Sequence, residues 1–388
     1  MDQRYIANNM PPQALTSLPE HSLKTSLEKI LKHTPPLQRY TSRQSGGLFS
    51  GYTGLAYLFL RLSASHPDLR VLGHSLRFWA GKYLEGDRGD LALTKGNCGL
   101  ACEKLSYQAV RACLSANNDD VVDFLSNMPM LLGPYPPGSG DPFCSEVVYG
   151  RSGALYMLRM IRHWVPGCES FLDSAVNRLS DLILHTDDDG RGHWEWHGKR
   201  YFGAAHGEIG IVTQLVLTRP LLAPRLARRV RHLLDLQCAD GNWPSSERKM
   251  SESKAPTLVQ WCHGSPGFII SLRALRPHFP QLQGDIDAAV RGGQQIVWQR
   301  GLLTKEPSLC HGIFGNALAL PKGSSREHFL SLATDEAVHR ARRHDSNLFA
   351  PASYDKEWAV LMNYHTSAAW AWAYCERDDP PFIMYTDV

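Results

Sequence analysis

Apolar residues recur along the chain with the spacing of helices. The first such segment has an i, i+4, i+7, i+8 pattern, which places four residues on one face of an amphipathic helix: Leu23, Leu27, Ile30 and Leu31. Residues 172–183 repeat this pattern, and the segments RLARRVRHLLDL and DIDAAVRGGQQIVW are further candidates. Alternating patterns with hairpin turns, which indicate strands, are scarce. The pattern therefore predicts an all-α protein.

A short glycine motif precedes a second kind of apolar segment. Gly-x-x-Gly followed by apolar residues occurs six times, starting at Gly51, Gly96, Gly150, Gly207, Gly264 and Gly312. Successive starts lie 45, 54, 57, 57 and 48 residues apart, and each interval is long enough for two helices and their loops. The segment after each motif is apolar on nearly all sides, as a buried helix is. We therefore predict a repeat in which an amphipathic outer helix precedes an apolar inner helix.

The regular interval predicts a closed ring. Seven helical hairpins would form an α/α toroid, with an inner and an outer ring of helices, in a single domain that spans residues 1–388. Residues 1–20 would form an N-terminal arm, and the repeats would occupy residues 21–388. The seventh repeat, YHTSAAWAWAY, starts 52 residues after the sixth motif and lacks the glycines, so we expect it to be degenerate.

Composition and charge narrow the class of protein. The chain has 41 Lys and Arg residues against 38 Asp and Glu, a net charge of +3, which argues against a nucleic-acid-binding or polybasic membrane protein. No apolar run approaches the roughly 20 residues that a transmembrane helix needs. Nine cysteines, an odd count in a long chain, argue against a secreted disulfide framework. We expect a soluble cytoplasmic protein.

Three of the glycine motifs contain residues that can do chemistry. Loops that lead into the inner helices meet at one end of an α/α ring, so residues beside the motifs should share one cavity. They are His206 in GAAHGEIG, Cys262 and His263 in WCHGSPG, and Cys310 and His311 in LCHGIFG. Because the two Cys-His-Gly triplets occupy equivalent positions of the repeat, they favour a metal site over buried cysteines without metal.

Cys262, Cys310 and His311 form a candidate zinc site. Two thiolates and an imidazole leave a fourth coordination position open, as in catalytic zinc sites. Two thiolate ligands make the metal electron-rich, so that a further bound thiol stays nucleophilic, and the set favours thiol chemistry over hydrolysis. Alcohol dehydrogenases and deaminases also use two cysteines and a histidine. His263 is either a fourth ligand or a residue that packs against the site and orients it, and we favour the second.

These motifs together resemble the lanthionine synthetase C-like (LanC-like) family. Its hallmark segments YGRSGALY, EWHGKRYFGAAHGEIGI, DGNWPS, WCHGSPG and LCHGIFGNA occur in this order, over about residues 40–320. The forms YGRSG and GAAHG, with the opening QRYIANN, are closer to the eukaryotic branch than to the bacterial lantibiotic cyclases. The resemblance implies an α/α toroid of seven hairpins with a central zinc, bound by Cys262, Cys310 and His311.

The resemblance also implies an activity and partners. Family members add a thiol across the double bond of dehydroalanine or dehydrobutyrine, which forms a thioether. The eukaryotic relatives bind glutathione and are similar to enzymes that add it to dehydroamino acids in proteins. The expected partners are therefore glutathione and a peptide or protein containing a dehydroamino acid, or a small electrophile.

Individual site residues are carried over from the family motifs. His206 matches the general acid/base histidine, which would protonate the enolate carbon after attack by sulfur. Glu146, Arg151 and Lys305 match charged positions of the family's catalytic site. Arg4 matches an N-terminal arginine that resembles a glutathione contact, and with Lys305 and Arg151 it would bind the two carboxylates of glutathione.

Two other interpretations remain open. A non-catalytic glutathione-binding or small-molecule-binding signalling protein of the same fold would keep the zinc and the glutathione contacts but would not need His206. Protein prenyltransferases and terpene cyclases share the α/α barrel, but their zinc set of Asp, Cys and His and their DxDD-type motif do not match this sequence. The chain departs from the family in its last repeat, MNYHTSAA, and in its tail, PPFIMYTDV. Both departures would change the shape of the cavity more than they would change the metal site.

Overall fold

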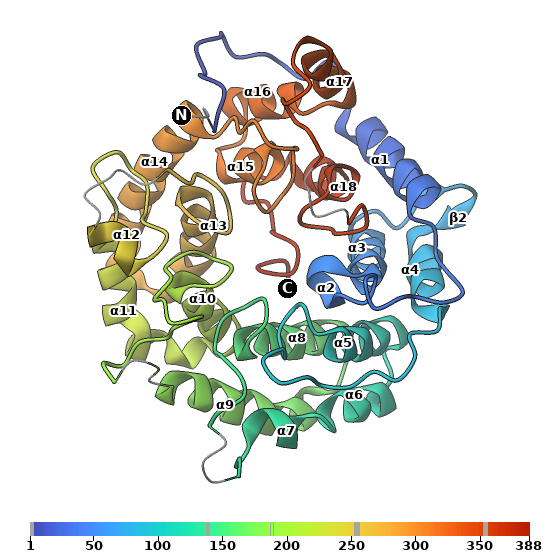
Figure 1. Ribbon diagram of the computed structural model, residues 1–388, viewed down its shortest axis with the longest axis vertical. Coiled ribbons are helices and arrows are strands. Elements are labelled where there is room, and N and C mark those ends of the chain that lie inside the picture. The colour runs from blue at the N-terminus through green and yellow to red at the C-terminus, as the bar shows by residue number, and fades with distance from the viewer. Residues whose placement is uncertain (1–3, 137–139, 187, 189, 252–256, 352–355) are drawn as a thin grey trace.

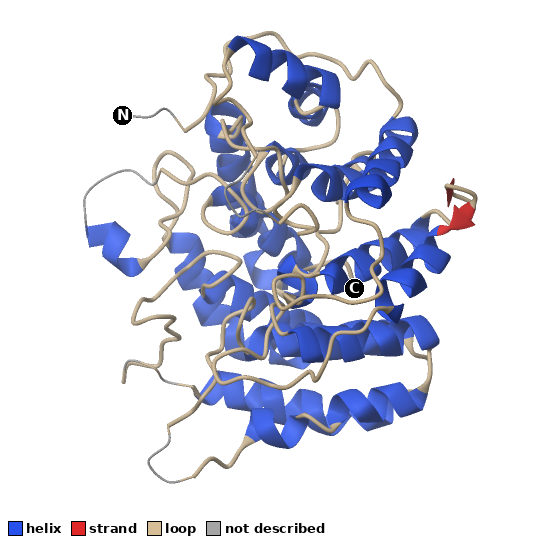
Figure 2. Ribbon diagram, turned by 45° about the vertical axis from the view of Figure 1, so that its right-hand side comes forward, coloured by secondary structure: helices blue, strands red, loops and turns tan. Residues whose placement is uncertain are grey.

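The computed structural model describes residues 4–136, 140–186, 188, 190–251, 257–351 and 356–388. Within these ranges the chain is mostly helical, and the paired strands are two short ones, β1 (Arg70–Val71) and β2 (His74–Ser75) (Figure 2). None of the described helices combines the length and the apolar character that crossing a membrane requires. The predicted all-α class is confirmed.

An inner ring of helices surrounds the centre of the molecule (Figure 1). They are α3 (Tyr52–Ser65), α5 (Glu103–Ser115), α8 (Arg151–Trp164), α10 (Glu208–Thr218), α13 (Ser265–Leu275), α15 (Ile313–Ala319) and α18 (Tyr364–Tyr374). Each contacts the next around the circle, and α18 contacts α3, which closes the ring. Most of these helices are apolar nearly all round, because neighbouring inner helices, the outer ring and the centre of the molecule cover their sides, whereas α5 and α8 also carry several charged residues. The predicted α/α toroid is confirmed.

An outer helix packs against each inner helix. In chain order these outer helices are α1 (Pro19–His33), α4 (Leu76–Glu85), α6 (Asn118–Leu125), α9 (Glu169–His185), α11 (Ala223–Asp235), α14 (Gln283–Arg300) and α16 (Ser324–Leu332). Six inner helices pack most extensively on the outer helix that follows them, not on the one before, which corrects the predicted pairing. The seventh, α18, packs on α1, so this hairpin joins the two ends of the sequence.

The remaining described helices belong to the connections between the ring helices. They are α2 (Gly47–Ser50), α7 (Met128–Leu132), α12 (Glu247–Ser251) and α17 (Asp335–His344), with three 3-10 turns at Pro220–Leu222, Arg276–His278 and Pro280–Leu282. One continuous apolar cluster runs through the inner and outer helices. This packed core supports the loops that precede the inner helices.

A close backbone approach requires the second glycine of the repeated motif. This glycine lies in the first turn of the inner helix, against the carbonyl oxygen of the residue six positions earlier. A Cβ on Gly210 would lie 2.1 Å from the carbonyl oxygen of Ala204, and a Cβ on Gly267 would lie 2.1 Å from that of Trp261. The same approach occurs at Gly54, Gly153 and Gly315. A larger residue would push the preceding loop away from its helix.

The second repeat meets this requirement without a glycine. Its inner helix α5 begins at Glu103, so the predicted motif at Gly96 lies in the loop before the helix, and the predicted register of this repeat is wrong. Ser106 occupies the position of the second glycine. Its hydroxyl donates a hydrogen bond of 3.3 Å to the carbonyl oxygen of Leu100, six residues earlier.

The seventh repeat also has a hydroxyl residue in place of the glycine. Thr366 occupies the glycine position in α18, and its hydroxyl donates a 3.2 Å hydrogen bond to the carbonyl oxygen of Val360. The side chain of Asn363 caps the helix by accepting a hydrogen bond from the backbone N–H of His365. The degenerate repeat therefore forms a complete inner helix.

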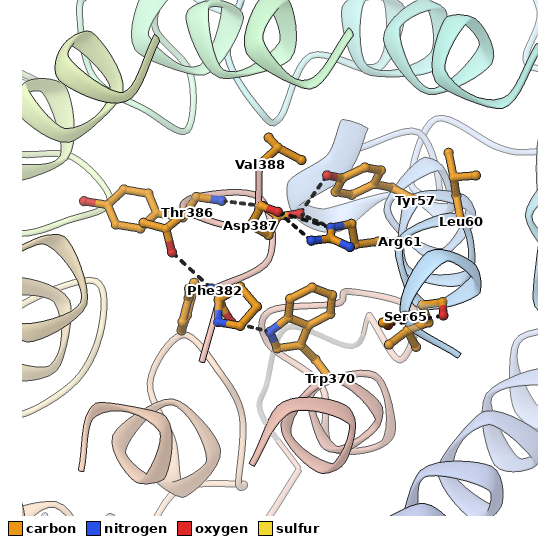
Figure 3. A network of polar contacts seen from close by, with 12 residues as sticks. Tyr57, Leu60, Arg61, Ser65, Trp370, Phe382, Thr386, Asp387 and Val388 are labelled. Atoms are coloured by element: carbon orange, nitrogen blue, oxygen red, sulfur yellow. Dashed lines mark hydrogen bonds and ion pairs between the residues drawn. The ribbon is translucent and has the colours of Figure 1, made fainter. Parts of the chain in front are cut away.

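The C-terminal segment 381–388 lies at the centre of the ring (Figures 1 and 3). The buried carboxylate of Asp387 accepts hydrogen bonds from the hydroxyls of Tyr57, at 2.7 Å, and Tyr156, at 2.9 Å. The guanidinium of Arg61 donates to the backbone carbonyl of Asp387 at 2.7 Å. These contacts tie the segment to α3 and α8.

Candidate functional site

The loops before four consecutive inner helices carry the predicted site residues. Glu146 precedes α8, His206 precedes α10, Cys262 precedes α13 and Cys310 precedes α15. The backbone N–H of Cys262 donates to the carbonyl of Cys310 at 3.3 Å, so the loops of two neighbouring repeats are directly joined. Residues that are distant in the sequence therefore meet at one end of the ring.

The side chains of Cys262 and Cys310 are close enough to interact with each other. The interaction with Cys310 is the largest cause of a lowered pKa at Cys262, which falls to about 7 in spite of burial. The side-chain amide of Gln260, 3.0 Å from the sulfur of Cys262, and the positive charges of His206 and Lys305 lower this pKa further. The same thiol pairing, with burial, raises the pKa of Cys310. The pair can therefore supply one thiolate near neutral pH.

His311 follows Cys310 directly and is buried. Burial and the charge of Lys305 lower the pKa of His311 to about 4, so its imidazole is neutral at pH 7, the form that binds zinc. The donor types thus fit zinc. In the part of the chain that the structure describes, no three His, Cys, Asp or Glu side chains are grouped closely enough to hold a metal ion. The structure brings the two thiols together, and the set of three ligands stays a prediction.

A buried carboxylate holds His206. The Nδ1 of His206 donates a 2.7 Å hydrogen bond to Oε2 of Glu146, whose side chain is 1% exposed. Glu146 also accepts hydrogen bonds from the backbone N–H groups of Val148, at 2.8 Å, and Tyr149. Because Glu146 engages Nδ1, the other ring nitrogen, Nε2, is the atom of His206 left for chemistry.

Aromatic rings enclose His206 on several sides. Trp196 stacks on its imidazole with 4.0 Å between the ring centroids and 6° between the planes. The rings of Tyr149 and Tyr201 lie 6.3 and 6.4 Å from it. The stacked indole and the hydrogen bond to Glu146 together restrict the imidazole to one orientation.

His263 faces the same histidine. Its ring centroid lies 6.2 Å from that of His206, and burial lowers its pKa to about 4. Its buried Nδ1 has no hydrogen-bond partner among the described residues. The structure therefore places His263 beside His206 as a neutral side chain, in keeping with a residue that packs against the site.

The N-terminal arm reaches the loop that contains Lys305. Tyr5 pairs in an antiparallel bridge with Leu303, and the carbonyl of Arg4 accepts a 3.1 Å hydrogen bond from the backbone N–H of Thr304. Arg4 and Lys305 are both exposed. The arm therefore brings Arg4 next to Lys305 along the backbone, and the charge of Lys305 acts on both thiols and on the neighbouring imidazole.

Arg151 is placed differently from the prediction. Its side chain is 0% exposed, and two of its nitrogens bind the carboxylate of Asp141 at 2.7 and 2.8 Å. Its remaining N–H groups donate to the carbonyls of Leu131 and Phe143 and to the hydroxyl of Tyr135. All five donors are engaged, so none is left for a carboxylate of glutathione. The structure gives Arg151 a positioning role in the loop before α8.

The described geometry can be compared with known proteins. Residues 17–326, well over half of the chain, match the family described as Lanthionine synthetase C-like protein. The chain belongs to the lanthionine synthetase C-like family. The resemblance seen in the sequence motifs is confirmed.

Two curated LanC-like relatives and one solved structure agree with this assignment. The chain is 29% identical over 390 residues to Glutathione S-transferase LANCL1 of Danio rerio, with 92% of this chain and 82% of the relative covered. It is 30% identical over 224 residues to LanC-like protein GCL1 of Arabidopsis thaliana, with coverages of 54% and 47%. Nisin cyclase aligns with a TM-score of 0.61 and 13% identity, over 90% of this chain and 93% of that one. At this identity the likeness shows the fold alone.

One residue of this LanC-like site was missed in the sequence. Trp196 stands in the hallmark segment EWHGKRYFGAAHGEIGI, ten residues before His206, but a single tryptophan is more often a core residue than a part of a site. The signal was in the segment itself. Its HG dipeptide indicates a tight turn, and its match to the family indicates a loop that contributes to the site.

Proposed function

We propose that the protein adds the thiol of glutathione to the double bond of a dehydroalanine or dehydrobutyrine residue, or a similar electrophile, and so forms a thioether. One observation carries this proposal: His206, hydrogen-bonded to Glu146, lies with its ring 6.2 Å from that of His263, the residue that directly follows Cys262. Membership in the LanC-like family and similarity to a relative named Glutathione S-transferase LANCL1 support it.

Cys262, Cys310 and His311 would hold the zinc ion that this chemistry uses. Zinc at this position would keep the sulfur of glutathione in its thiolate form at neutral pH. The two cysteines donate charge to the site, so the sulfur stays nucleophilic. Lys305, whose charge acts on all three proposed ligands, would attract a carboxylate of glutathione, and Arg4 on the adjacent arm would bind the other.

His206 would complete the reaction by moving a proton. Attack of the thiolate on the β-carbon forms the carbon–sulfur bond, breaks the carbon–carbon π bond and leaves an enolate. The α-carbon then needs one proton, which balances the proton lost by the thiol. Protonated His206 would deliver it from Nε2 while Glu146 holds Nδ1 and stabilises the imidazolium. Trp196 would keep the imidazole plane fixed during the transfer.

Mass spectrometry tests the proposal directly. A peptide that contains one dehydroalanine is incubated with glutathione and the protein, and the glutathione adduct is measured over time. We expect the adduct with the wild type, and a rate lower by about 10²–10⁴ with His206→Ala, the range for lost general acid–base catalysis. His232→Ala, which replaces an exposed histidine on α11, should react as the wild type does. Binding of glutathione without any adduct would instead support a non-catalytic binding protein.

A further inference from the structure

A pocket of about 830 Å³ opens beside the candidate site. Two of its lining residues, Trp196 and Tyr149, are also rings that enclose His206, so one layer of side chains separates the pocket from the proposed proton donor. The end of α9 also lines the pocket, with Leu182, His185 and the following residue, Thr186. The pocket is therefore continuous with the wall of the site but does not contain its thiols.

Two tight turns bound this pocket. Trp196 begins a two-residue turn whose central residues, His197 and Gly198, have φ values of 49° and 64°. Positive φ at both positions is typical of the type I′ turn of a β-hairpin, which leaves little freedom to the residues beside it. A second tight turn, over residues 94–97, places Gly96 at the edge of the pocket. The indole of Trp196 is thus presented by a short, well-defined loop.

An ion pair between the buried Arg151 and the exposed Asp141 supports a further part of the wall. The guanidinium of Arg151 binds both carboxylate oxygens of Asp141 and the carbonyl of Phe143, and Asp141 and Phe143 line the pocket. Because Arg151 is fully buried, this wall is fixed before any ligand arrives. The pocket is preformed, as small-molecule and peptide sites usually are.

We propose that this pocket binds the peptide segment next to the dehydroamino acid, an inference that rests on the proposed function. Its volume is enough for several residues, and its lining residue Trp196 also stacks on His206. Phe143, Leu182 and Trp196 offer apolar surface for side chains of the peptide. An acceptor held here would place its reactive residue past the edge of Trp196.

A pocket-filling variant tests the assignment. His185 is exposed at the end of α9 and takes no part in the proposed chemistry, so His185→Trp should fill the pocket without unfolding the chain. We expect the KM for a dehydroalanine heptapeptide to rise by about tenfold. The KM for N-acetyl-dehydroalanine amide, which is too small to need the pocket, and both kcat values should stay unchanged. His232→Trp, which adds an indole outside the pocket, should leave the KM for both acceptors unchanged.

A binding measurement separates this inference from the proposed function. The same heptapeptide with alanine in place of dehydroalanine cannot react, so calorimetry reports its binding alone. His185→Trp should weaken this binding by about tenfold. Equal binding to wild type and variant, or an equal rise of KM for both acceptors, would overturn the pocket assignment. If the wild type reacts with neither acceptor, the proposed function fails, and binding of the alanine peptide still decides the pocket.

Discussion

At the scale of single residues, neighbours indicate the role of each site side chain more than its type does. A lone histidine is as often a packed residue as a catalyst. Glu146 at 2.7 Å and the indole of Trp196 at 4.0 Å support the proposed chemical role of His206. In the same way, five engaged donors distinguish Arg151 from a free arginine that could bind a carboxylate.

Zinc content is the first prediction at this scale. We expect about one zinc per chain in the wild type, and its loss in Cys262→Ala and in Cys310→Ala, because each change removes one of the three proposed ligands. Metal analysis of purified protein measures this, with Cys238→Ala as the control cysteine. Full zinc occupancy in both ligand variants would contradict the assignment.

The second prediction at this scale concerns the affinity for glutathione. Lys305→Ala and Arg4→Ala should each weaken binding by about 1–3 kcal/mol, the range for a charge-assisted contact. Calorimetry measures the change, and Lys24→Ala, an exposed lysine on α1, is the matched control. If Lys305→Ala and Arg4→Ala both bind as tightly as the control, other residues hold the carboxylates of glutathione.

The sequence shows the candidate ligands but not the state of the charged residues. Two Cys-His-Gly triplets stand at equivalent positions of a repeat, so their meeting could be inferred from the period alone. The partner of Arg151 could not be inferred from the sequence. Asp141 lies ten residues away, in an irregular loop that has no periodic pattern. The stacking of Trp196 on His206 was hidden for the same reason.

At the scale of elements, each inner helix depends on the close approach of its first turn to the loop before it. Glycine allows this approach in five repeats, whereas Ser106 and Thr366 replace it with a hydroxyl that bonds the facing carbonyl. A sequence search for glycines therefore finds most of the repeats. It misplaces the second, where Gly96 belongs to a tight turn instead, and it makes the seventh look degenerate.

The seventh inner helix predicts a pH dependence of stability. The pKa of His365 is lowered from 6.5 to about 4 in the folded chain. Burial is the largest cause, and the charges of Lys29, His33 and His339 add to it. Because the pKa is lower in the folded chain, the unfolded chain binds the extra proton as the pH falls from about 6.5 to 4. The contribution of neutral His365 is therefore present above pH 6.5 and is lost as the pH falls toward 4.

His365→Gln tests this prediction, because glutamine does not titrate. The loss in free energy of unfolding between pH 7 and pH 4 should be smaller in the variant by about 2–3 kcal/mol. Urea unfolding at both pH values measures it, and His232→Gln, at an exposed position, should keep the loss of the wild type. An unchanged loss in His365→Gln would show that His365 is not held neutral by its surroundings.

At the scale of the whole molecule, the two ends of the sequence complete the ring. Helix α1 packs on α18, and the segment 381–388 fills the centre, where Phe382 stacks on Trp261 with 4.9 Å between centroids. Trp261 directly precedes Cys262, so the central segment also supports the loop of the proposed metal site. The period of the motifs predicted seven hairpins, but nothing in the sequence of α1 indicates that its partner is the last helix.

The central segment provides a prediction for global stability. Asp387→Ala would remove the buried carboxylate that accepts hydrogen bonds from Tyr57 and Tyr156 and forms an ion pair with the partly buried Arg61. We expect a loss of about 3–5 kcal/mol in the free energy of unfolding, the range for breaking a buried ion pair. Asp68→Ala, at an exposed position, should stay within about 0.5 kcal/mol of the wild type in the same urea titration. Equal stability of the two variants would contradict a structural role for the central segment.

The measurement that tests the central claim most directly follows the proton at the α-carbon. The addition of glutathione to a dehydroalanine peptide is run in D₂O, and the configuration of the deuterated product is determined. If His206 delivers this proton, the wild type gives one configuration, while His206→Ala reacts more slowly and gives both, because solvent then supplies the deuteron. A single configuration formed at the wild-type rate by His206→Ala would remove His206 from the reaction.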